Sequence, residues 1–362
     1  MPHRALRDKV QELDIRGVHF FCFKSEDDNL LWLLKNLFIK SHKYKRNRFL
    51  IKSIIKKVNP DIVHVIGAEN PYYSYAAMDV STKIPLVVSL QTLMSESGFY
   101  DNYNIDRKSY LFRSRLEQDI IKRCDYIASP VIQFKEYVQE KIKSNAIFLK
   151  MPLAVGVSID IASCDKEFDF VYFAADISKA ADYAVEAFAE AHKIHPDIKL
   201  NVSGGYTPEY KKEIDELITR LGINDSVFFT GSKDTHDEVI KQIKKSRFAL
   251  LPLKVDLVSG TIREAMACGL PVVTTITPAT PDLNKNKECV LLSEKGDYKA
   301  MADNMIRLIE DEEGTDVVRN NALSLIQEMH SNEKDMIKWR AGYYEIVDNF
   351  NNGTPFSDDL LL

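Results

Sequence analysis

The sequence predicts an α/β protein made of two doubly wound domains that face a ligand-binding cleft. Three observations support this prediction. The chain has 362 residues, which is long for a single hydrophobic core. Apolar runs alternate with amphipathic segments, and a polar stretch at 151–167 separates two such series. Strands that are apolar throughout and are separated by helices are typical of parallel sheets covered on both faces, and such sheets bind ligands in clefts at their edges.

The first series contains five predicted strands: VHFFCF, DIVHVI, IPLVVSL, DYIASP and AIFLKMP. Segments 30–57 and 107–123 between them have helical spacing. A helix-like segment precedes VHFFCF, and the strand with a glycine turn that normally opens such a domain is missing. Either the fold begins unusually or Met1 lies inside a longer reading frame, and we favour the second explanation.

The second series is complete. Its predicted strands are FDFVYFAA, IKLNVSGG, SVFFTG, FALLPL, LPVVTT and ECVLL. Its predicted helices lie near 180–194, 209–221, 235–245, 261–268 and 298–310. We therefore expect an N-terminal Rossmann-like domain at 1–155 without its first strand, a second Rossmann-like domain at 156–330, and a C-terminal segment at 331–362. In that segment we expect a helix that packs back on the N-terminal domain, followed by a flexible tail.

Composition limits the classes of function. The net charge of −5 argues against a nucleic-acid partner. The sequence contains no run of 18 apolar residues, so no transmembrane helix is predicted. The charged N-terminus does not resemble a signal peptide. The five cysteines are scattered and never form a C-x-x-C pair, which favours a reduced, cytoplasmic protein with buried thiols and no metal site.

The stretch DLVSGTIREAMACGLPVV has the features of a short helix with a ligand at its start. Thr261 is predicted to be the N-cap of a capping box with Glu264, and Gly269 the left-handed residue after the helix. At the carboxyl edge of a sheet, the N–H groups of Ser259, Gly260 and Thr261 would favour an anion.

Two carboxylates flank this predicted anion site. Glu264 is placed to accept hydrogen bonds from a vicinal diol, and Asp256 from other hydroxyl groups. A diphosphate between two hydroxyl-binding carboxylates suits a nucleotide sugar, which has a ribose at one end and a hexose at the other.

These residues resemble the E-x7-E motif of family-4 retaining glycosyltransferases, which have the GT-B fold of two Rossmann-like domains. The motif stands here as D-x7-E, followed by AMACGLPVV. NPDIVHVIGAENPYYSYAA with KIPLVVSLQ is similar to the N-terminal domain of the family. ADYAVEAFAEAHKIHPDIKLNVSGG, LGINDSVFFTG and FALLPL are similar to its C-terminal domain, and the likeness covers roughly residues 8 to 312.

The resemblance implies roles for the donor side. Glu264 would bind the ribose, and Ser259 to Thr261 would hold the diphosphate. Asp256 takes the place of the first glutamate, beside the reaction centre, and Lys179 that of a phosphate-binding lysine. The usual second cation, an arginine before that lysine, is absent, and Arg263 is the expected substitute. Backbone near Gly205 would contact the base.

On the acceptor side, Glu69 and Asn70 follow a predicted strand at the cleft. Gln91 stands where the family often has a histidine. His64, within an apolar strand, is expected to be a core residue rather than a catalytic one.

The implied reaction is glycosyl transfer with retention from a nucleotide diphosphate sugar, without a metal or another cofactor. The glycan acceptor is expected to be lipid-linked, in bacterial capsule, lipopolysaccharide or exopolysaccharide synthesis. Two alternatives remain: a degenerate GT-B homologue that binds nucleotide sugar or glycan without transfer, and another GT-B enzyme such as a nucleotide-sugar epimerase.

The segment 35–57 contains nine Lys or Arg residues and no acid. A basic amphipathic helix with aromatic residues suits an anionic membrane surface. It is equally consistent with a solvated basic face. A peripheral position on the inner face of the plasma membrane is therefore expected if the acceptor is lipid-linked.

Overall fold

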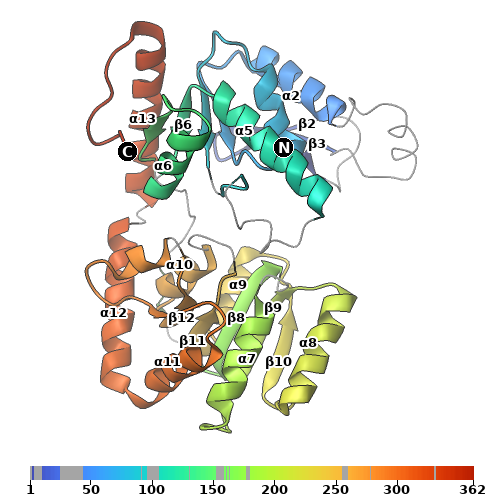
Figure 1. The fold of residues 1–362 in the computed structure, drawn as a ribbon, viewed down its shortest axis with the longest axis vertical. Coiled ribbons are helices and arrows are strands. Elements are labelled where there is room, and N and C mark those ends of the chain that lie inside the picture. Colours follow the sequence, from blue (N-terminus) through green and yellow to red (C-terminus); the bar gives the residue numbers. More distant parts are fainter. Residues whose placement is uncertain are drawn as a thin grey trace. The chain divides into compact units, whose positions relative to one another are not determined.

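The protein is described by a computed structural model that covers residues 2–3, 10–24, 44–90, 92–95, 106–129, 131–151, 159, 161–162, 164–176, 180–254, 260–277, 279–329 and 332–362. The chain forms two compact units (Figure 1). Unit 1 comprises Met1–Leu153 with Met336–Leu362, and unit 2 comprises Ala154–Asp335. Each unit is built around a parallel sheet.

The main sheet of unit 1 has four parallel strands in the order β4-β5-β6-β7. The strands are β4 (Val63–Ile66), β5 (Leu86–Ser89), β6 (Tyr126–Ala128) and β7 (Ile147–Leu149). Its helical segments are α2 (Lys45–Val58), α3 (Pro71–Ser74), η1 (Tyr75–Asp79), α5 (Arg107–Arg123) and α6 (Ile132–Lys141). Every side chain of β5 is buried, because it is a central strand with helices on the sheet faces.

A small second sheet in unit 1 corrects one expectation. It has the order β1-β3-β2, with strands β1 (Pro2–His3), β2 (Gln11–Ile15) and β3 (Val18–Lys24). The segment before VHFFCF is therefore a strand, not a helix. Arg16 and Gly17 join β2 to β3 with φ angles of 51° and 79°, the backbone of the two-residue turn that matches the twist of an antiparallel hairpin. This turn and the strand pairing that it permits determine the conformation of the segment, despite its helical spacing of apolar residues.

Helix α13 (Asn332–Asn352) contributes Trp339 and Ile346 to the core of unit 1, where they pack near Val87 and Leu149. Residues 353–362 correct the expectation of a flexible tail. The backbone of Leu361 forms an antiparallel bridge with Leu149 in β7. Leu360 accepts a hydrogen bond from the backbone N–H of Lys150 and is 8% exposed.

Unit 2 is a doubly wound domain with six parallel strands in the order β10-β9-β8-β11-β12-β13. These are β8 (Phe168–Asp176), β9 (Leu200–Gly205), β10 (Val227–Gly231), β11 (Ser246–Leu251), β12 (Val272–Thr275) and β13 (Leu291–Ser293). The order runs outward from β8 on one side and from β11 on the other. A topological switch point therefore lies between β8 and β11.

The helical segments of unit 2 are α7 (Ala181–His192), α8 (Pro208–Leu221), α9 (His236–Ile243), α10 (Gly260–Ala267), η3 (Thr280–Asn284), α11 (Tyr298–Glu310) and α12 (Glu312–Met329). Helix α7 contacts α8 and α11, and α10 contacts α12. The predicted helices at 107–123 and 298–310 are confirmed at their full lengths, because each begins behind an Asp N-cap, Asp106 and Asp297.

Two further features bear on the expectations from composition. None of the helices in the described part of the chain combines the length and apolarity needed to span a bilayer. All five cysteines are free, but only Cys124, Cys268 and Cys289 are buried, whereas Cys22 and Cys164 are partly exposed.

Candidate functional site

The topology of unit 2 directs attention to the edge where β8 and β11 end. In open parallel sheets, ligands bind outside the carboxyl ends of the strands at the switch point. Lys179 follows β8 in the chain, and Asp256 and Ser259 follow β11, but these three predicted site residues lie outside the described residues. Their roles stay predictions. The described part of this edge consists of the starts of α7, α9 and α10 and the residues directly after β11.

Helix α10 begins at Gly260, one residue earlier than predicted. Thr261 therefore lies inside the first turn and is not the N-cap, so the prediction of a Thr261–Glu264 capping box is wrong. The helix ends as expected, since Gly269 has a φ of 71° and Leu270 donates a backbone hydrogen bond to Ala265. The first N–H groups of an α-helix have no acceptor within the helix itself, and such a helix start favours an anion. Among the described residues, no atom lies within 4 Å of a Cβ placed on Gly260, which leaves room for a ligand beside its backbone.

Glu264 lies one turn into α10 and is partly exposed, with 21% of its side chain accessible. Burial raises the pKa of its carboxyl group, and His236 opposes that shift. The His236 Nε2 atom lies 3.9 Å from Glu264 Oε1. His236 is the first residue of α9, whose N-cap is Thr235. His236 was not predicted from the sequence, although α9 follows a parallel strand and its first residue therefore lies at the same edge of the sheet as the start of α10.

A second site residue that was not predicted from the sequence is the lysine that follows β11. Lys254 Nζ donates to Asp182 Oδ2 at 2.6 Å and lies 4.7 Å from the ring centre of Tyr183. Asp182 and Tyr183 belong to the first turn of α7, which follows β8. This ion pair therefore joins the two chain segments that leave the switch point. The buried Asp182 Oδ1 atom has no hydrogen-bond partner among the described residues.

The remaining predicted donor residues have distinct environments. Arg263 is 9% exposed, so most of its side chain lies within unit 2. Gly205 ends β9, and a Cβ there would stand 3.1 Å from the carbonyl oxygen of Ala175. The close approach of these two backbones explains why glycine occupies the position.

On the acceptor side, Glu69 and Asn70 follow β4 in unit 1. Asn70 caps α3, and its side-chain oxygen accepts a hydrogen bond from the Tyr72 N–H at 3.2 Å. Burial raises the pKa of Glu69, and its buried Oε2 atom has no hydrogen-bond partner among the described residues. Gln91 lies outside the described residues. His64 is partly buried, and its ring contacts Ser89 and Tyr343 inside unit 1, in agreement with the expectation of a core histidine.

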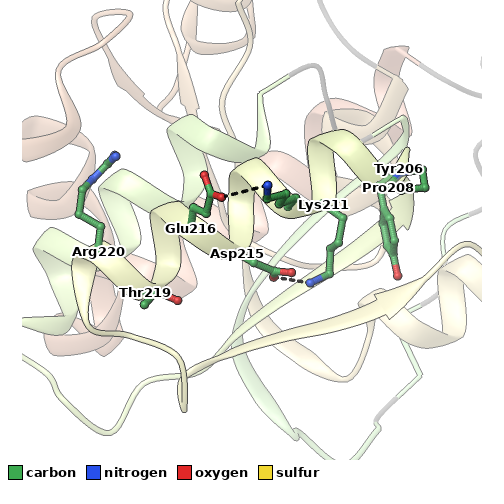
Figure 2. A pocket seen from close by; sticks show the side chains of 8 residues that line it. Tyr206, Pro208, Lys211, Asp215, Glu216, Thr219 and Arg220 are labelled. Carbon is green, nitrogen blue, oxygen red and sulfur yellow. Dashed lines mark hydrogen bonds and ion pairs between the residues drawn. The ribbon is translucent and has the colours of Figure 1, made fainter.

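Two hollows in unit 2 lie away from this edge. One, of about 860 Å³, runs along α8, where Figure 2 shows Lys211 and Asp215 joined by an ion pair and Tyr206 beyond them. The other, of about 660 Å³, lies where β8 and β11 begin and is lined in part by Lys166, Arg247 and Arg319. Both are open surface hollows without the predicted donor residues, so we assign the candidate site from the sheet topology.

Metal-binding side chains do not gather anywhere in the described part of the chain: no group of three or more His, Cys, Asp or Glu residues is placed to hold an ion there. The polar groups at the carboxyl edge of unit 2 are the N–H groups of a helix start, the partly buried carboxylate of Glu264 and the ammonium group of Lys254. This set suits an anionic ligand that also carries hydroxyl groups.

Comparison with known proteins agrees with this geometry. Residues 162–324 match the family model of glycosyl transferases group 1. Among curated proteins, the N-acetyl-alpha-D-glucosaminyl L-malate synthase of Bacillus anthracis is 30% identical over 175 residues, which cover 48% of this chain and 44% of that protein. The capsular polysaccharide biosynthesis glycosyltransferase CapM of Staphylococcus aureus is 25% identical over 149 residues, 39% of each chain. The chain thus spans less than half the length of these curated relatives.

Solved structures extend the likeness to both units. Sucrose-phosphate synthase from Thermosynechococcus elongatus has a TM-score of 0.74 at 15% identity and covers 94% of this chain and 86% of its own. The Anabaena protein HepE, in complex with UDP and glucose, has a TM-score of 0.64 at 15% identity, over 90% and 85% of the two chains. Residues 162–324 are thus similar to the glycosyl transferases group 1 family, and the chain has the GT-B fold.

Proposed function

We propose that the protein is a retaining glycosyltransferase of family-4 type that moves a sugar from a nucleotide diphosphate donor to a glycan acceptor. One observation carries the proposal. The open start of α10 at Gly260 and the partly buried Glu264 occur together at the switch-point edge of unit 2, within the region that matches the family. This combination provides an anion site beside a diol site, as a nucleotide diphosphate sugar requires.

Each described group has a stated role in this proposal. The N–H groups of the first turn of α10 bind the diphosphate, and Glu264 accepts hydrogen bonds from the ribose hydroxyls. Lys254 stands at the same edge and neutralises charge on the departing diphosphate, a role that the sequence analysis gave to Lys179 and Arg263. Catalysis then rests on positioning and on stabilisation of the charge that develops on the leaving group. Lys179 and Asp256 remain the predicted catalytic residues.

The relatives supply the first donor to test. HepE was solved with UDP and glucose, and a pneumococcal O-GlcNAc transferase of similar fold with UDP and GlcNAc. CapM is a capsular polysaccharide biosynthesis glycosyltransferase. We therefore place UDP-sugars first, and a bacterial surface polysaccharide such as capsule, lipopolysaccharide or exopolysaccharide as the product.

The test is thermal unfolding with UDP-, GDP-, ADP- and CMP-sugars, for the wild type, Glu264→Ala and Glu213→Ala. Glu213 is an exposed residue of α8 and serves as the matched control. A ligand at about 100 times its Kd stabilises the native state by about 2.7 kcal/mol. We expect a shift of the unfolding temperature with sugars of one base, lost in Glu264→Ala and kept in Glu213→Ala.

Other outcomes contradict particular parts of the proposal. No shift with any nucleotide sugar refutes the donor site. A shift without transfer to any acceptor indicates a binding protein. Turnover of the donor in the absence of an acceptor, with a new sugar stereochemistry, indicates an epimerase. NMR of the anomeric proton of the product tests retention.

A lipid-linked acceptor would place unit 1 at a membrane, and α2 supports this extension. The helix contains six Lys or Arg residues and no acid. Lys45, Phe49, Lys52 and Lys56 are all exposed and share the i, i+4, i+7, i+11 spacing of one helix face. Phe49 is 72% exposed. Basic residues near an anionic surface contribute about 1 kcal/mol each, and an aromatic side chain adds apolar contact.

Flotation with phosphatidylglycerol and phosphatidylcholine vesicles tests this extension. We expect binding to the anionic vesicles only, and loss of binding in a Lys45→Glu, Lys52→Glu, Lys56→Glu triple variant. Arg48→Gln is not a suitable substitute, because Arg48 pairs with Asp79 inside the unit. Equal binding of the wild type and the triple variant contradicts the extension but leaves the donor site untouched.

A further inference from the structure

Glu117 is a buried carboxylate that the proposed function does not use. It lies on α5 and is 0% exposed. Its Oε2 atom accepts a hydrogen bond from the Met94 N–H at 3.0 Å. Its Oε1 atom accepts from the Ser95 N–H at 3.0 Å and from the Ser95 hydroxyl at 2.9 Å. Burial of a carboxylate is costly unless its oxygens are hydrogen-bonded, and here all three bonds go to one short segment.

The carbonyl groups of the same two residues are also fixed by side chains. Tyr110, on α5, donates to the Met94 carbonyl at 2.8 Å, and Tyr137, on α6, donates to the Ser95 carbonyl at 2.5 Å. Both N–H groups and both carbonyl groups of this irregular backbone are therefore held by Glu117 and two tyrosines. Secondary structure normally satisfies such groups. Here, dedicated polar side chains hold the segment in one conformation.

The segment lies next to the predicted acceptor-side residues of unit 1. Residues 92–95 follow β5, and Thr92 comes directly after Gln91 in the chain. Glu69 follows β4, which is parallel to β5, so both segments leave the same edge of the sheet. Glu69 and Glu117 are near enough that the charge of Glu69 contributes to raising the pKa of Glu117. Glu117 thus lies beside both segments that carry the predicted acceptor-side residues.

We propose that Glu117 is a positioning residue for acceptor binding, which fixes the backbone after β5 so that the predicted acceptor-side edge of unit 1 is preorganised. The inference rests on the proposed function, because it assumes a glycan acceptor at this edge. It assigns Glu117 no contact with the reacting atoms. Its effect is to hold the acceptor-binding backbone in one arrangement before the acceptor arrives, which lowers the cost of ordering at binding.

The protonation state of Glu117 provides a readout that simple packing would not give. Burial, reinforced by Glu69, raises the pKa of Glu117 to about 7. Arg113 is the cation that acts on Glu69, and Tyr110 and Tyr137 bond to the held segment rather than to the carboxylate. Protonation converts one carboxyl oxygen from an acceptor into a donor. Acceptor binding should therefore weaken as the pH falls below 7.

The experiment compares wild type, Glu117→Gln and Glu140→Gln. Glutamine keeps the size of the side chain but presents an NH2 group to one of the two backbone N–H donors. Glu140 is an exposed residue of α6 in the same unit and serves as the control. Transfer is measured with the nucleotide sugar that shifts the unfolding temperature and with a panel of p-nitrophenyl α- and β-glycosides as acceptor probes.

At pH 8 we expect Glu117→Gln to raise the acceptor KM by about tenfold while the donor KM stays within about twofold of the wild type. We expect the wild-type acceptor KM to rise between pH 7 and pH 6, and the KM of Glu117→Gln to stay constant over that range. Glu140→Gln should behave as the wild type. These three results together support a positioning role.

Two results overturn the inference. An equal rise of both KM values in Glu117→Gln indicates a general loss of structure, and an unchanged acceptor KM with a constant pH profile shows that the held segment has no part in acceptor binding. In either case the wild type still transfers sugar, so the proposed function stands. If the wild type binds no nucleotide sugar and transfers none, the proposed function fails and the inference falls with it.

Discussion

The imidazole Nδ1 atom of His64 lies 2.7 Å from the hydroxyl oxygen of Tyr343. His64 belongs to β4 and Tyr343 to α13, 279 residues later in the chain. The other ring nitrogen of His64 lies 2.8 Å from the Ser89 hydroxyl, and Trp339 stacks on the ring with 5.0 Å between centres. A C-terminal helix is thus joined to the sheet of unit 1 by specific polar contacts as well as by apolar packing.

Replacement of Tyr343 by Phe should destabilise unit 1. The change removes the hydroxyl partner of a partly buried ring nitrogen, and loss of a hydrogen bond of this kind costs about 1 kcal/mol. Tyr344→Phe is the matched control, because Tyr344 is the next residue and is 66% exposed. Urea unfolding followed by tryptophan fluorescence is the measurement, since Trp339 belongs to the core of unit 1. Equal midpoints for the two variants would show that the contact contributes nothing.

His64 and Glu117 should give unit 1 opposite dependences on pH. Burial lowers the pKa of His64 from 6.5 to about 4. The unfolded state therefore binds more protons between these values, and stability is lost as the pH falls from 6.5 to 4. Burial raises the pKa of Glu117 from 4.5 to about 7. In that window the folded state binds more protons, and stability is lost as the pH rises. Each effect amounts to about 3 kcal/mol.

In the wild type the two effects should largely cancel between pH 4.5 and 6.5. His64→Gln should leave a stability that falls as the pH rises, to which the raised pKa of Glu69 adds in the same direction. Glu117→Gln should leave a stability that rises with pH. Urea midpoints at several pH values, read by tryptophan fluorescence, check both slopes. Slopes of the same sign in the two variants would refute this account.

His236 should extend nucleotide-sugar binding to lower pH. Burial raises the pKa of Glu264, and the charge of His236 lowers it. His236→Ala removes the opposing charge, so Glu264 should be protonated at a higher pH and donor binding should decline earlier as the pH falls. Calorimetric titration of the donor from pH 8 to pH 5 measures the effect. A decline at the same pH in the variant and the wild type would separate His236 from the site.

Gly260→Ala should reduce donor binding without loss of stability. A Cβ at Gly260 meets no atom of the described segments within 4 Å, and its φ is not among the positive values, so we expect alanine to fit the free protein. The same Cβ would stand in the space that the diphosphate is proposed to occupy. Gly269→Ala is the contrasting variant, because its φ of 71° costs alanine about 1 kcal/mol of stability. Donor titration should show weaker binding for Gly260→Ala only, and thermal unfolding should show lower stability for Gly269→Ala only. Undiminished binding by Gly260→Ala would exclude a diphosphate at this position.

Lys254→Gln should weaken donor binding by about 1–2 kcal/mol, the loss expected for one charge-assisted contact to an anion. Lys212→Gln is the control, because Lys212 is an exposed lysine of α8 with 79% of its side chain accessible. The difference between Lys254→Gln and wild type should shrink for a nucleoside without phosphates. Isothermal titration with the nucleotide sugar and with the nucleoside measures both values, and an equal loss for both ligands would assign Lys254 to the nucleoside instead.

The parts of the fold set by local chemistry could be read from the sequence. The succession of strands and helices along the chain follows from the alternation of apolar runs and amphipathic segments, and α5 and α11 begin behind Asp N-caps that are visible in the sequence. The hairpin at Gln11–Lys24 was missed because Arg16–Gly17 is an uncommon pair for its turn, and charged residues in β2 imitate helical spacing. The tail was misjudged because its polar composition conceals backbone bonds to β7.

Some residues of the candidate site could also be predicted from the sequence, and others could not. Glu264 and Gly260 could be predicted because they share one short motif. His236, Lys254 and Glu117 could not, because each acts through a partner distant in sequence: Glu264 is 28 residues from His236, and Asp182 is 72 residues from Lys254. Such pairs arise only when parallel strands bring successive helix starts to one edge. Glu117 in particular reads as an ordinary exposed position of an amphipathic helix.

The pairing of residues 360–362 with β7 has a practical consequence for work with this protein. Lys150 donates its N–H to Leu360, and Leu362 donates its N–H to the Phe148 carbonyl. These bonds cover the outer edge of β7, which would otherwise offer a row of free peptide groups to a strand from another molecule. A truncation at residue 352, or an affinity tag that displaces these residues, should convert a monodisperse preparation into one that associates edge to edge.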